Sequence, residues 1–166
     1  MKPIIYQLLP RTFANYNDTR RHNGTLQENG CGTLNAITPK ALRAIRDLGA
    51  THVWYTGVIR HATAQYNTPA IVKGQAGSPY AITDYYDIDP DLCENKRQRM
   101  KEFIALVERS HQANLDVIIA AVPASNVNLR CEIVRIINYN PIRNYRTYTN
   151  AIISDIKVNS YQGTDI

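Results

Sequence analysis

The chain has 166 residues, 44% of them hydrophobic and 20% charged, which is typical of a soluble globular domain with an apolar core. No apolar run approaches the roughly 20 residues of a membrane-spanning helix, so no membrane partner is expected. The formal net charge of +5 is spread along the chain and gives little support for a nucleic-acid partner.

The N-terminus and the cysteines bear on the location of the protein and on metal or disulfide sites. One lysine precedes a short apolar stretch that Pro10 interrupts, and no small-residue cleavage pattern follows. The sequence therefore predicts no signal peptide and, by default, a cytoplasmic location. Cys31, Cys93 and Cys131 are isolated, and no histidine lies at ligand spacing from them, which predicts neither a metal site nor a disulfide framework.

Three short apolar segments are the expected strands. They cover residues 4–9, 52–58 and 117–122 and contain few polar residues. Such runs are typical of strands that are buried on both faces of a parallel sheet. Because helical patterns separate them, the strands should be joined by right-handed crossovers.

Two amphipathic helices are expected, at residues 38–48 and 96–113. Thr38 is a suitable N-cap, and Pro39 is suited to the first helical position. In the second helix, apolar residues recur at helical spacing and Glu102 falls on the expected solvent-facing side. Both helices should cover the same face of the sheet, which would leave the opposite face and the sheet edges open.

Long loops are expected at residues 14–37 and 59–90. The second one contains Gly77–Pro90, whose glycine and prolines predict a loop rather than a regular element. Tyrosines and aspartates gather in this stretch, namely Tyr80, Asp84, Tyr85, Tyr86, Asp87 and Asp89. A tyrosine ring can cover the apolar face of a pyranose while a carboxylate accepts from its hydroxyls. The alternative is a surface loop whose tyrosines pack on the scaffold and whose aspartates, with Asp91, cap turns.

Two motifs occur in a characteristic order. Residues 6–13 have the pattern Tyr-Gln-x-x-Pro-Arg-x-Phe, and the later loop has the pattern Tyr80-x-x-x-Asp84-x-Tyr86 followed by Ile88-Asp89-Pro90. Together with their spacing and the three expected strands, these motifs resemble the first three βα units of the alpha-amylase family of glycoside hydrolases (glycoside hydrolase family thirteen). The resemblance covers roughly residues 3–123.

The resemblance implies an α/β fold in which residues 1–123 form the first three βα units of an incomplete TIM (β/α)8 barrel. Residues 124–166 do not resemble the family and form an unrelated polar tail that is rich in Asn, Tyr and Ile. The sequence does not determine the fold of this tail. Within this tail, Cys131–Ile137 fits either a helix turn or a strand, and Ile152–Val158 fits a strand.

The family pattern also implies roles for individual residues. Tyr80 occupies the position that stacks on the sugar at the cleavage point. Asp84 and Tyr86 fit the same motif as scaffold for that loop, Asp84 by holding backbone amides. His61 follows the second strand at the edge where barrel sites form, and it either contacts the ligand or belongs to the loop structure. The expected substrate-binding residues are therefore Tyr80, Asp84, Tyr86 and His61.

A calcium site is not expected. The third strand of the family ends in the motif Asp-x-x-x-Asn-His, whose Asn helps to bind calcium and whose His contacts the sugar. The matching positions here are Ala120, Ala124 and Ser125. Because Ala124 offers no side-chain oxygen and Ser125 no imidazole, neither role carries over, and no cofactor is expected.

The resemblance also implies a function. The family hydrolyses or transfers α-glucosidic links with retention, using a nucleophilic Asp, a general-acid Glu and a stabilising Asp on later strands. No residue of the chain matches these three by motif. The expected function is that of an α-glucan-acting glycoside hydrolase, represented by a truncated, inactive chain whose ligand is an α-glucan or maltooligosaccharide. The alternative is a non-catalytic remnant that binds carbohydrate weakly or associates with a partner, including a second copy of the chain.

Overall fold

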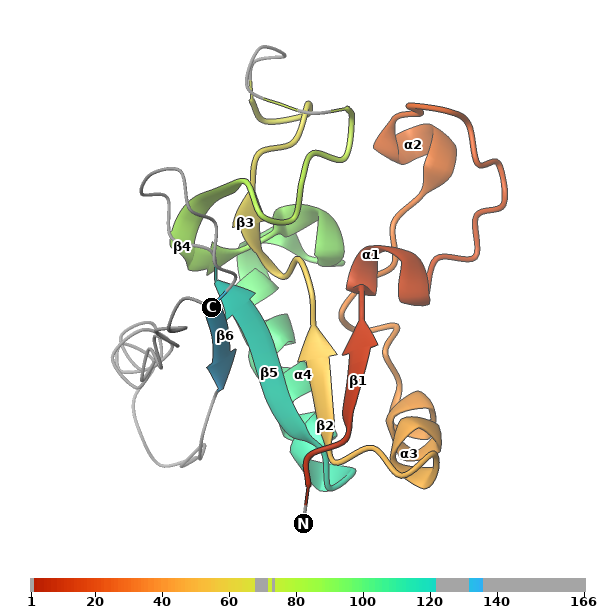
Figure 1. The fold of residues 1–166 in the computed structure, drawn as a ribbon. Coiled ribbons are helices and arrows are strands. Elements are labelled where there is room, and N and C mark those ends of the chain that lie inside the picture. The colour runs from red at the N-terminus through yellow and green to blue at the C-terminus, as the bar shows by residue number, and fades with distance from the viewer. Residues whose placement is uncertain (1, 68–71, 73, 122–131, 136–166) are drawn as a thin grey trace, which may run out of the picture.

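The computed structural model describes residues 2–67, 72, 74–121 and 132–135. A four-stranded sheet in the order β1-β2-β5-β6 forms its centre (Figure 1). Its strands are β1 (Ile5–Leu8), β2 (His52–Tyr55), β5 (Asp116–Ala121) and β6 (Glu132–Arg135). β1, β2 and β5 run parallel to one another, which confirms the three predicted parallel strands.

The register of the parallel strands places Leu8, Tyr55 and Ile119 level with one another. Side chains that are level in a sheet lie on the same face, and all three are almost completely buried. Burial alternates along β1 and β2, and on the opposite face Ile5 is 46% exposed. The expectation that these strands are buried on both faces is therefore wrong for β1 and β2, because the described helices cover one face only.

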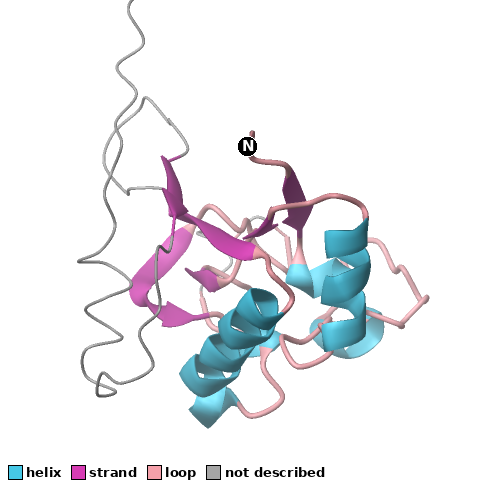
Figure 2. Cartoon of the chain, turned by 90° about the horizontal axis from the view of Figure 1, so that it is seen from below, coloured by secondary structure: helices cyan, strands magenta, loops and turns pink. Residues whose placement is uncertain are grey.

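Helices α3 (Pro39–Asp47) and α4 (Arg99–Gln112) pack beside one another on the buried face of the sheet (Figure 2). The hydroxyl of Thr38 accepts from the backbone N–H of Ala41 over 3.2 Å and caps α3, as predicted. Both predicted helices and their common face are confirmed. In the described parts of the chain, no helix is long and apolar enough to cross a membrane.

A buried polar contact fastens β2 to α4. The hydroxyl of Tyr55 lies 2.8 Å from Oγ of Ser110, which itself donates to the carbonyl oxygen of Leu106 over 2.8 Å. Because Ser110 uses its proton on Leu106, Tyr55 is the donor to Ser110. Burial raises the pKa of the Tyr55 phenol, so its hydroxyl stays protonated and available for this contact.

The stretch Gly77–Pro90 is not the loop that the sequence predicts. It contains β4 (Ile82–Ile88), which pairs antiparallel with β3 (Ile59–His61) in a second, two-stranded sheet. The breakers lie outside the seven residues of β4, which are rich in β-branched and aromatic side chains. β3 supplies the hydrogen-bonding partner, and the pattern within 77–90 could not reveal that partner.

Four short helical turns complete the described structure: α1 (Pro10–Phe13), α2 (Leu26–Asn29) and the 3-10 turns η1 (Pro90–Leu92) and η2 (Lys96–Gln98). Of these, α2 interrupts the predicted loop at residues 14–37, and η2 takes the first turn of the helix predicted at residues 96–113. α2 begins with a capping box, in which Thr25 accepts from the N–H of Glu28 and the Glu28 carboxylate accepts from the N–H of Thr25. This Thr-x-x-Glu signal is visible in the sequence and the expectation of a continuous loop missed it.

Glu102 is not on the solvent-facing side of its helix as predicted, because it is only 9% exposed. Its carboxylate accepts from the backbone N–H of Glu94 over 3.1 Å and of Asn95 over 2.8 Å. The chain entering α4 folds back over the first turn of the helix, and its backbone donors need an acceptor there. This tertiary requirement overrides the helical pattern.

β6 is antiparallel to β5, with Ile118 opposite Arg135 and Ala121 opposite Glu132. Of the two alternatives for Cys131–Ile137, the structure supports the strand, over Glu132–Arg135. Antiparallel pairing differs from the all-parallel strands of a (β/α)8 barrel. The expected strand Ile152–Val158 lies outside the described residues.

Candidate functional site

The parallel strands end together at one edge of the sheet, and the loops that follow β1 and β2 lie beyond that edge (Figure 1). The side-chain amide of Gln7 donates to the hydroxyl of Thr56 over 3.0 Å and so links β1 to the residue that follows β2. In parallel sheets, ligands bind outside the carboxyl ends of the strands. A ligand site is therefore expected at this edge of the sheet.

A close packing contact fixes the second loop on this edge. Gly57 follows β2 with φ +73°, and a Cβ there would lie 2.8 Å from Cβ of Pro79 and 3.4 Å from Cδ1 of Leu9. Only glycine combines this left-handed backbone with such a close approach. Pro79 is thereby held against the ends of β1 and β2, and Tyr80, the next residue, is held beside them.

Gly77 permits a second close approach on the same loop. Its φ is +68°, and a Cβ there would lie 1.7 Å from the carbonyl oxygen of Ala62, which no side chain could tolerate. The backbone N–H of Ala62 donates to the carbonyl of Ala81 over 2.9 Å, and that of Ala81 donates to the carbonyl of Ser78 over 2.9 Å. These contacts close a tight turn that presents Tyr80.

The three motif residues around this turn differ in exposure and contacts. The ring of Tyr80 is 44% exposed, which suits a stacking surface. Asp84 accepts from the backbone N–H of Tyr86 over 2.9 Å, so it holds loop backbone in the way the sequence predicts. Asp84 and Tyr86 occupy one face of β4, two residues apart, and Tyr86 is 57% exposed.

His61 lies under the loop rather than on its surface, with 5% exposure. Its Nδ1 is 3.2 Å from the carbonyl oxygen of Ile59 and 3.0 Å from Oδ2 of Asp89, and its Nε2 is 3.3 Å from the carbonyl oxygen of Ala76. The Asp89 contact is an ion pair rather than an aligned hydrogen bond, since Oδ2 has no hydrogen-bonded donor in the described structure. Of the two roles considered for His61, this placement supports the loop-structure role.

Both ring nitrogens of His61 face oxygen acceptors, which favours the doubly protonated imidazolium. Burial lowers the pKa of His61, but the contact with the Asp89 carboxylate and its charge outweigh burial and raise the pKa above its ordinary value. The buried cation and the buried carboxylate therefore stabilise each other.

Asp87 is held between two arginines. It accepts from Nη2 of Arg99 over 2.8 Å and from Nη1 of Arg60 over 3.0 Å. Burial raises the pKa of the Asp87 carboxyl, but the hydrogen bonds from Arg99 and Arg60 outweigh it and leave the pKa below its ordinary value. Asp87 is thus ionised and links Arg60 of β3 to Arg99 of α4, which differs from the predicted role in a turn or cap.

Asp91 and Arg11 join the loops that follow the first two strands. Nη2 of Arg11 lies 3.5 Å from Oδ2 of Asp91, whose side chain is 3% exposed. The hydroxyl of Tyr66 donates to Oδ1 of Asp91 over 3.1 Å. Asp89 accepts from the N–H of Asp91 over 2.9 Å and caps η1, which agrees with its predicted cap role.

The comparisons with known proteins bear directly on this edge of the sheet. A model of the alpha-amylase catalytic domain matches residues 7–130. The chain belongs to the alpha-amylase family. The match begins within β1 and includes the turn of Tyr80, His61 and the ion pairs of Asp87 and Asp91.

Solved structures similar to this family member include three enzymes. The trehalose-6-phosphate hydrolase of Bacillus licheniformis is 22% identical with a TM-score of 0.43, and the match covers 72% of this chain and 18% of that one. An alpha-glucosyl transfer enzyme, XgtA, is 26% identical with a TM-score of 0.46 and coverage of 72% and 18%. A maltogenic alpha-amylase of Thermotoga neapolitana is 26% identical with a TM-score of 0.47 and coverage of 72% and 24%. The chain thus spans about a fifth of the length of these structures. A comparison with curated proteins gives no match.

The third-strand motif of the alpha-amylase family is described only in part. Ala120 lies in β5, whereas Ala124 and Ser125 lie outside the described residues. Within the residues that are described, no group of three His, Cys, Asp or Glu side chains is arranged to hold a metal ion.

Sequence reasoning missed the partners that organise the site. Arg11, Arg60 and Arg99 each pair with an aspartate on the β4–η1 segment. One signal was available, because Arg11 belongs to the Tyr-Gln-x-x-Pro-Arg-x-Phe motif and is a charged residue directly after an apolar strand. The pairing partners themselves are distant in sequence, and no local pattern identifies them.

We expect His61→Gln to destabilise the chain strongly at pH 6, by about 3–5 kcal/mol, because the substitution leaves Asp89 as a buried unpaired charge. Because the pKa of His61 is raised in the folded chain, the ion pair stabilises the fold fully below the unfolded-state pKa of about 6.5. This stabilisation is lost as the pH rises through the folded-state pKa of His61. The difference between His61→Gln and the unsubstituted chain should therefore shrink towards pH 9. Urea unfolding across this pH range measures it.

The matched control is His22→Gln, because His22 is exposed. This control should change the free energy of unfolding by less than about 0.5 kcal/mol. If His61→Gln unfolds like the control at every pH, the ion pair with Asp89 does not support the loop.

Proposed function

We propose that residues 1–123 are the first three βα units of a retaining, α-glucan-acting glycoside hydrolase barrel and form part of its glucan site. The observation that carries this proposal is the match to the alpha-amylase catalytic domain over residues 7–130. Residues 124–166 are then a separate segment, although the family match continues to residue 130. The antiparallel pairing of β6 supports a change of structure before Glu132, because barrel strands are parallel.

In this proposal Tyr80 is the platform on which a glucose ring stacks. The contact between Gly57 and Pro79 supports it, since it places Tyr80 beside the ends of β1 and β2, where barrel enzymes build their sites. The exposed ring can cover the C–H face of a pyranose. Asp84 orders the backbone of Tyr86, Tyr86 supplies a second exposed ring on β4, and His61 supports the loop from beneath.

Residues 1–166 do not hydrolyse the glucan by themselves in this proposal. Retaining hydrolysis needs two carboxyl groups about 5–5.5 Å apart across the scissile bond, one of them protonated. The aspartates at the site are engaged otherwise: Asp84 with the backbone N–H of Tyr86, Asp87 with Arg99, Asp89 with His61, and Asp91 with Arg11. The pKa of Asp87 is lowered, which is opposite to what a general acid requires.

Maltoheptaose should bind the chain weakly, with a Kd of roughly 1 mM, and Tyr80→Ala should weaken binding about tenfold, or ~1.4 kcal/mol. Ligand-observed NMR titration measures both values. Tyr16→Ala is the matched control, because Tyr16 is 93% exposed and lies outside the turn of Tyr80. Equal affinities for Tyr80→Ala and Tyr16→Ala would show that Tyr80 is not the platform.

The purified chain should show no hydrolysis of starch, maltooligosaccharides or an aryl α-glucoside, since no residue matches the catalytic carboxylates of the family by motif and Asp87, Asp89 and Asp91 are paired with cations. Reducing-end assays over long incubations at several pH values check this expectation. Turnover that an α-glucosidase transition-state mimic abolishes would contradict it.

The alternative, association with a second copy, has an observation of its own. Ile4 and Ile5 are 54% and 46% exposed beside β1, which is the outermost strand at its side of the sheet among the described strands. An open edge next to apolar side chains favours pairing with another chain. Sedimentation across a concentration series should therefore show reversible self-association, which Ile5→Lys weakens. A concentration-independent monomer would rule this alternative out.

A further inference from the structure

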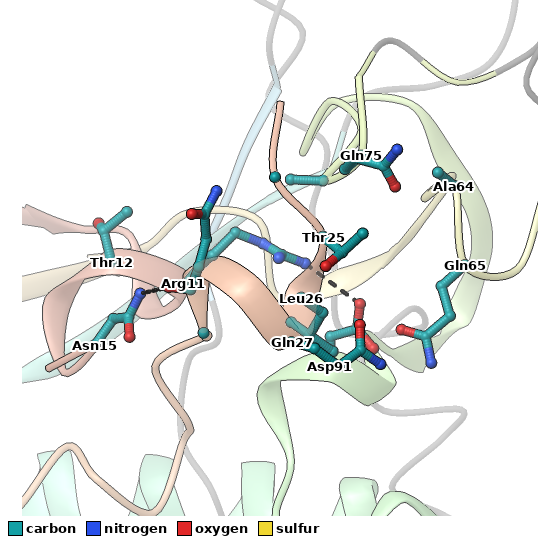
Figure 3. Close-up of a pocket in the computed structure, with 14 residues that line it drawn as sticks. Arg11, Thr12, Asn15, Thr25, Leu26, Gln27, Ala64, Gln65, Gln75 and Asp91 are labelled. Carbon is teal, nitrogen blue, oxygen red and sulfur yellow. Dashed lines mark hydrogen bonds and ion pairs between the residues drawn. The ribbon is translucent and has the colours of Figure 1, made fainter. Parts of the chain in front are cut away.

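A pocket of about 390 Å³, with polar and apolar surface in similar shares, lies between the loop that follows β1 and the loop that follows β2 (Figure 3). Its lining comes from residues 11–30, from residues 64, 65, 75 and 76 and from Asp91. Tyr80 is not among the lining residues. We propose that this pocket binds a neutral polyhydroxyl ligand, a mono- or disaccharide, at a site separate from the Tyr80 platform.

The charges in the lining compensate each other. Among the described residues of the lining, Arg11 is the cation and Asp91 the anion, and Nη2 of Arg11 lies 3.5 Å from Oδ2 of Asp91. Figure 3 marks this contact with a dashed line. The other charged group next to Asp91, Nζ of Lys96 at 3.6 Å, is not part of the lining. A compensated pair gives no net attraction for a phosphate or carboxylate, whereas its donors and acceptors suit hydroxyl groups.

The Arg11–Asp91 pair retains hydrogen-bonding capacity. Nη2 of Arg11 is buried and makes no hydrogen bond within the described residues. At 3.5 Å the Asp91 carboxylate is an ion-pair partner of this nitrogen without forming a hydrogen bond, and a hydroxyl oxygen that enters the pocket can accept from its N–H. Asp91 Oδ1 already accepts from Tyr66, so its carboxylate is fixed in place before any ligand binds.

Three glutamine amides line the remainder of the pocket. The side chains of Gln27, Gln65 and Gln75 make no hydrogen bond within the described part of the chain, and each carries both a donor and an acceptor. The N–H donor and the carbonyl acceptor of one amide can bind two neighbouring hydroxyls of a sugar ring. Leu26 and the alanines Ala64 and Ala76 add apolar surface for the C–H groups of the ring.

The asparagines of the lining have a different task, because they brace the first loop. Nδ2 of Asn15 donates to the carbonyl of Asn29 over 2.8 Å, and Nδ2 of Asn29 donates to the carbonyl of Arg21 over 2.8 Å. Gly30 has φ +69°, and a Cβ there would lie 2.7 Å from Oδ1 of Asn15. The asparagine amides are therefore occupied, and the glutamine amides remain for a ligand.

The two loops are fastened to each other, so the pocket exists before a ligand enters it. The backbone N–H of Gln75 donates to Oδ1 of Asn23 over 3.2 Å, which crosses from one loop to the other. His61 holds the carbonyl of Ala76 from beneath. A preformed pocket avoids the cost of ordering loops on binding, and its volume lies within the range of small-molecule sites.

The test is a titration of the isotopically labelled full chain with maltose, followed by amide NMR. Shifts are expected at the pocket residues Thr25, Gln75 and Ala76, with a Kd of roughly 1 mM. The double variant Gln65→Ala/Gln75→Ala should weaken maltose binding at least about tenfold. Both glutamines are exposed, so the variant should fold normally.

Two controls separate this pocket from the Tyr80 platform. Gln112→Ala makes the same substitution at an exposed residue at the end of α4, outside the pocket, and should leave maltose binding unchanged. Tyr80→Ala should retain the maltose-induced shifts at Thr25, Gln75 and Ala76 even where it weakens maltoheptaose binding. The proposal for the pocket and the proposal for Tyr80 can therefore be disproved separately.

Three results would overturn the inference. The first is the absence of shifts at the pocket amides at about 10 mM maltose, which is ten times the expected Kd. The second is a double variant that binds maltose as the unsubstituted chain does. The third is displacement of maltose by glucose 6-phosphate at much lower concentration, which would make the pocket an anion site.

Discussion

The buried ion pair between His61 and Asp89 is the contact on which the loops at the carboxyl ends of the parallel strands depend. His61 belongs to β3, Asp89 caps η1, and the second ring nitrogen of His61 holds the carbonyl of Ala76 in the loop between them. Through these three attachments the pair fixes the turn that presents Tyr80 and one wall of the pocket. Because a buried charge without its partner is costly, neither residue can be lost without disturbing both sites.

Aspartates in this region act mainly as structural anions. Asp87 lies between Arg60 and Arg99, and Asp91 meets Arg11 and the Tyr66 hydroxyl. Each pair joins segments that the strand and helix pattern leaves separate. An acidic, tyrosine-rich stretch at the ends of parallel strands can suggest catalytic carboxylates, but carboxylates that are paired with arginines are ionised and oriented for support rather than for proton transfer.

Membership in the alpha-amylase family explains why this edge of the sheet is elaborated. Parallel strands in register bring their carboxyl ends together, so loops that are distant in sequence become neighbours there. Gly57 and Gly77 permit backbone approaches that any Cβ would block, and they bring the second loop close to the strand ends.

The sequence by itself determined the three parallel strands, the two helices with the Thr38 cap, and the family, because apolar periodicity, capping residues and motif spacing are local properties. The tertiary structure alone decided that β4 is a strand, since its partner β3 is distant from it in the sequence. It likewise decided that Glu102 is buried beneath the chain entering α4 and that Arg11 faces Asp91. The physical reason is that a hydrogen-bond acceptor or a counter-charge is supplied by whatever segment folding brings near, and no pattern within a few residues records which segment that is.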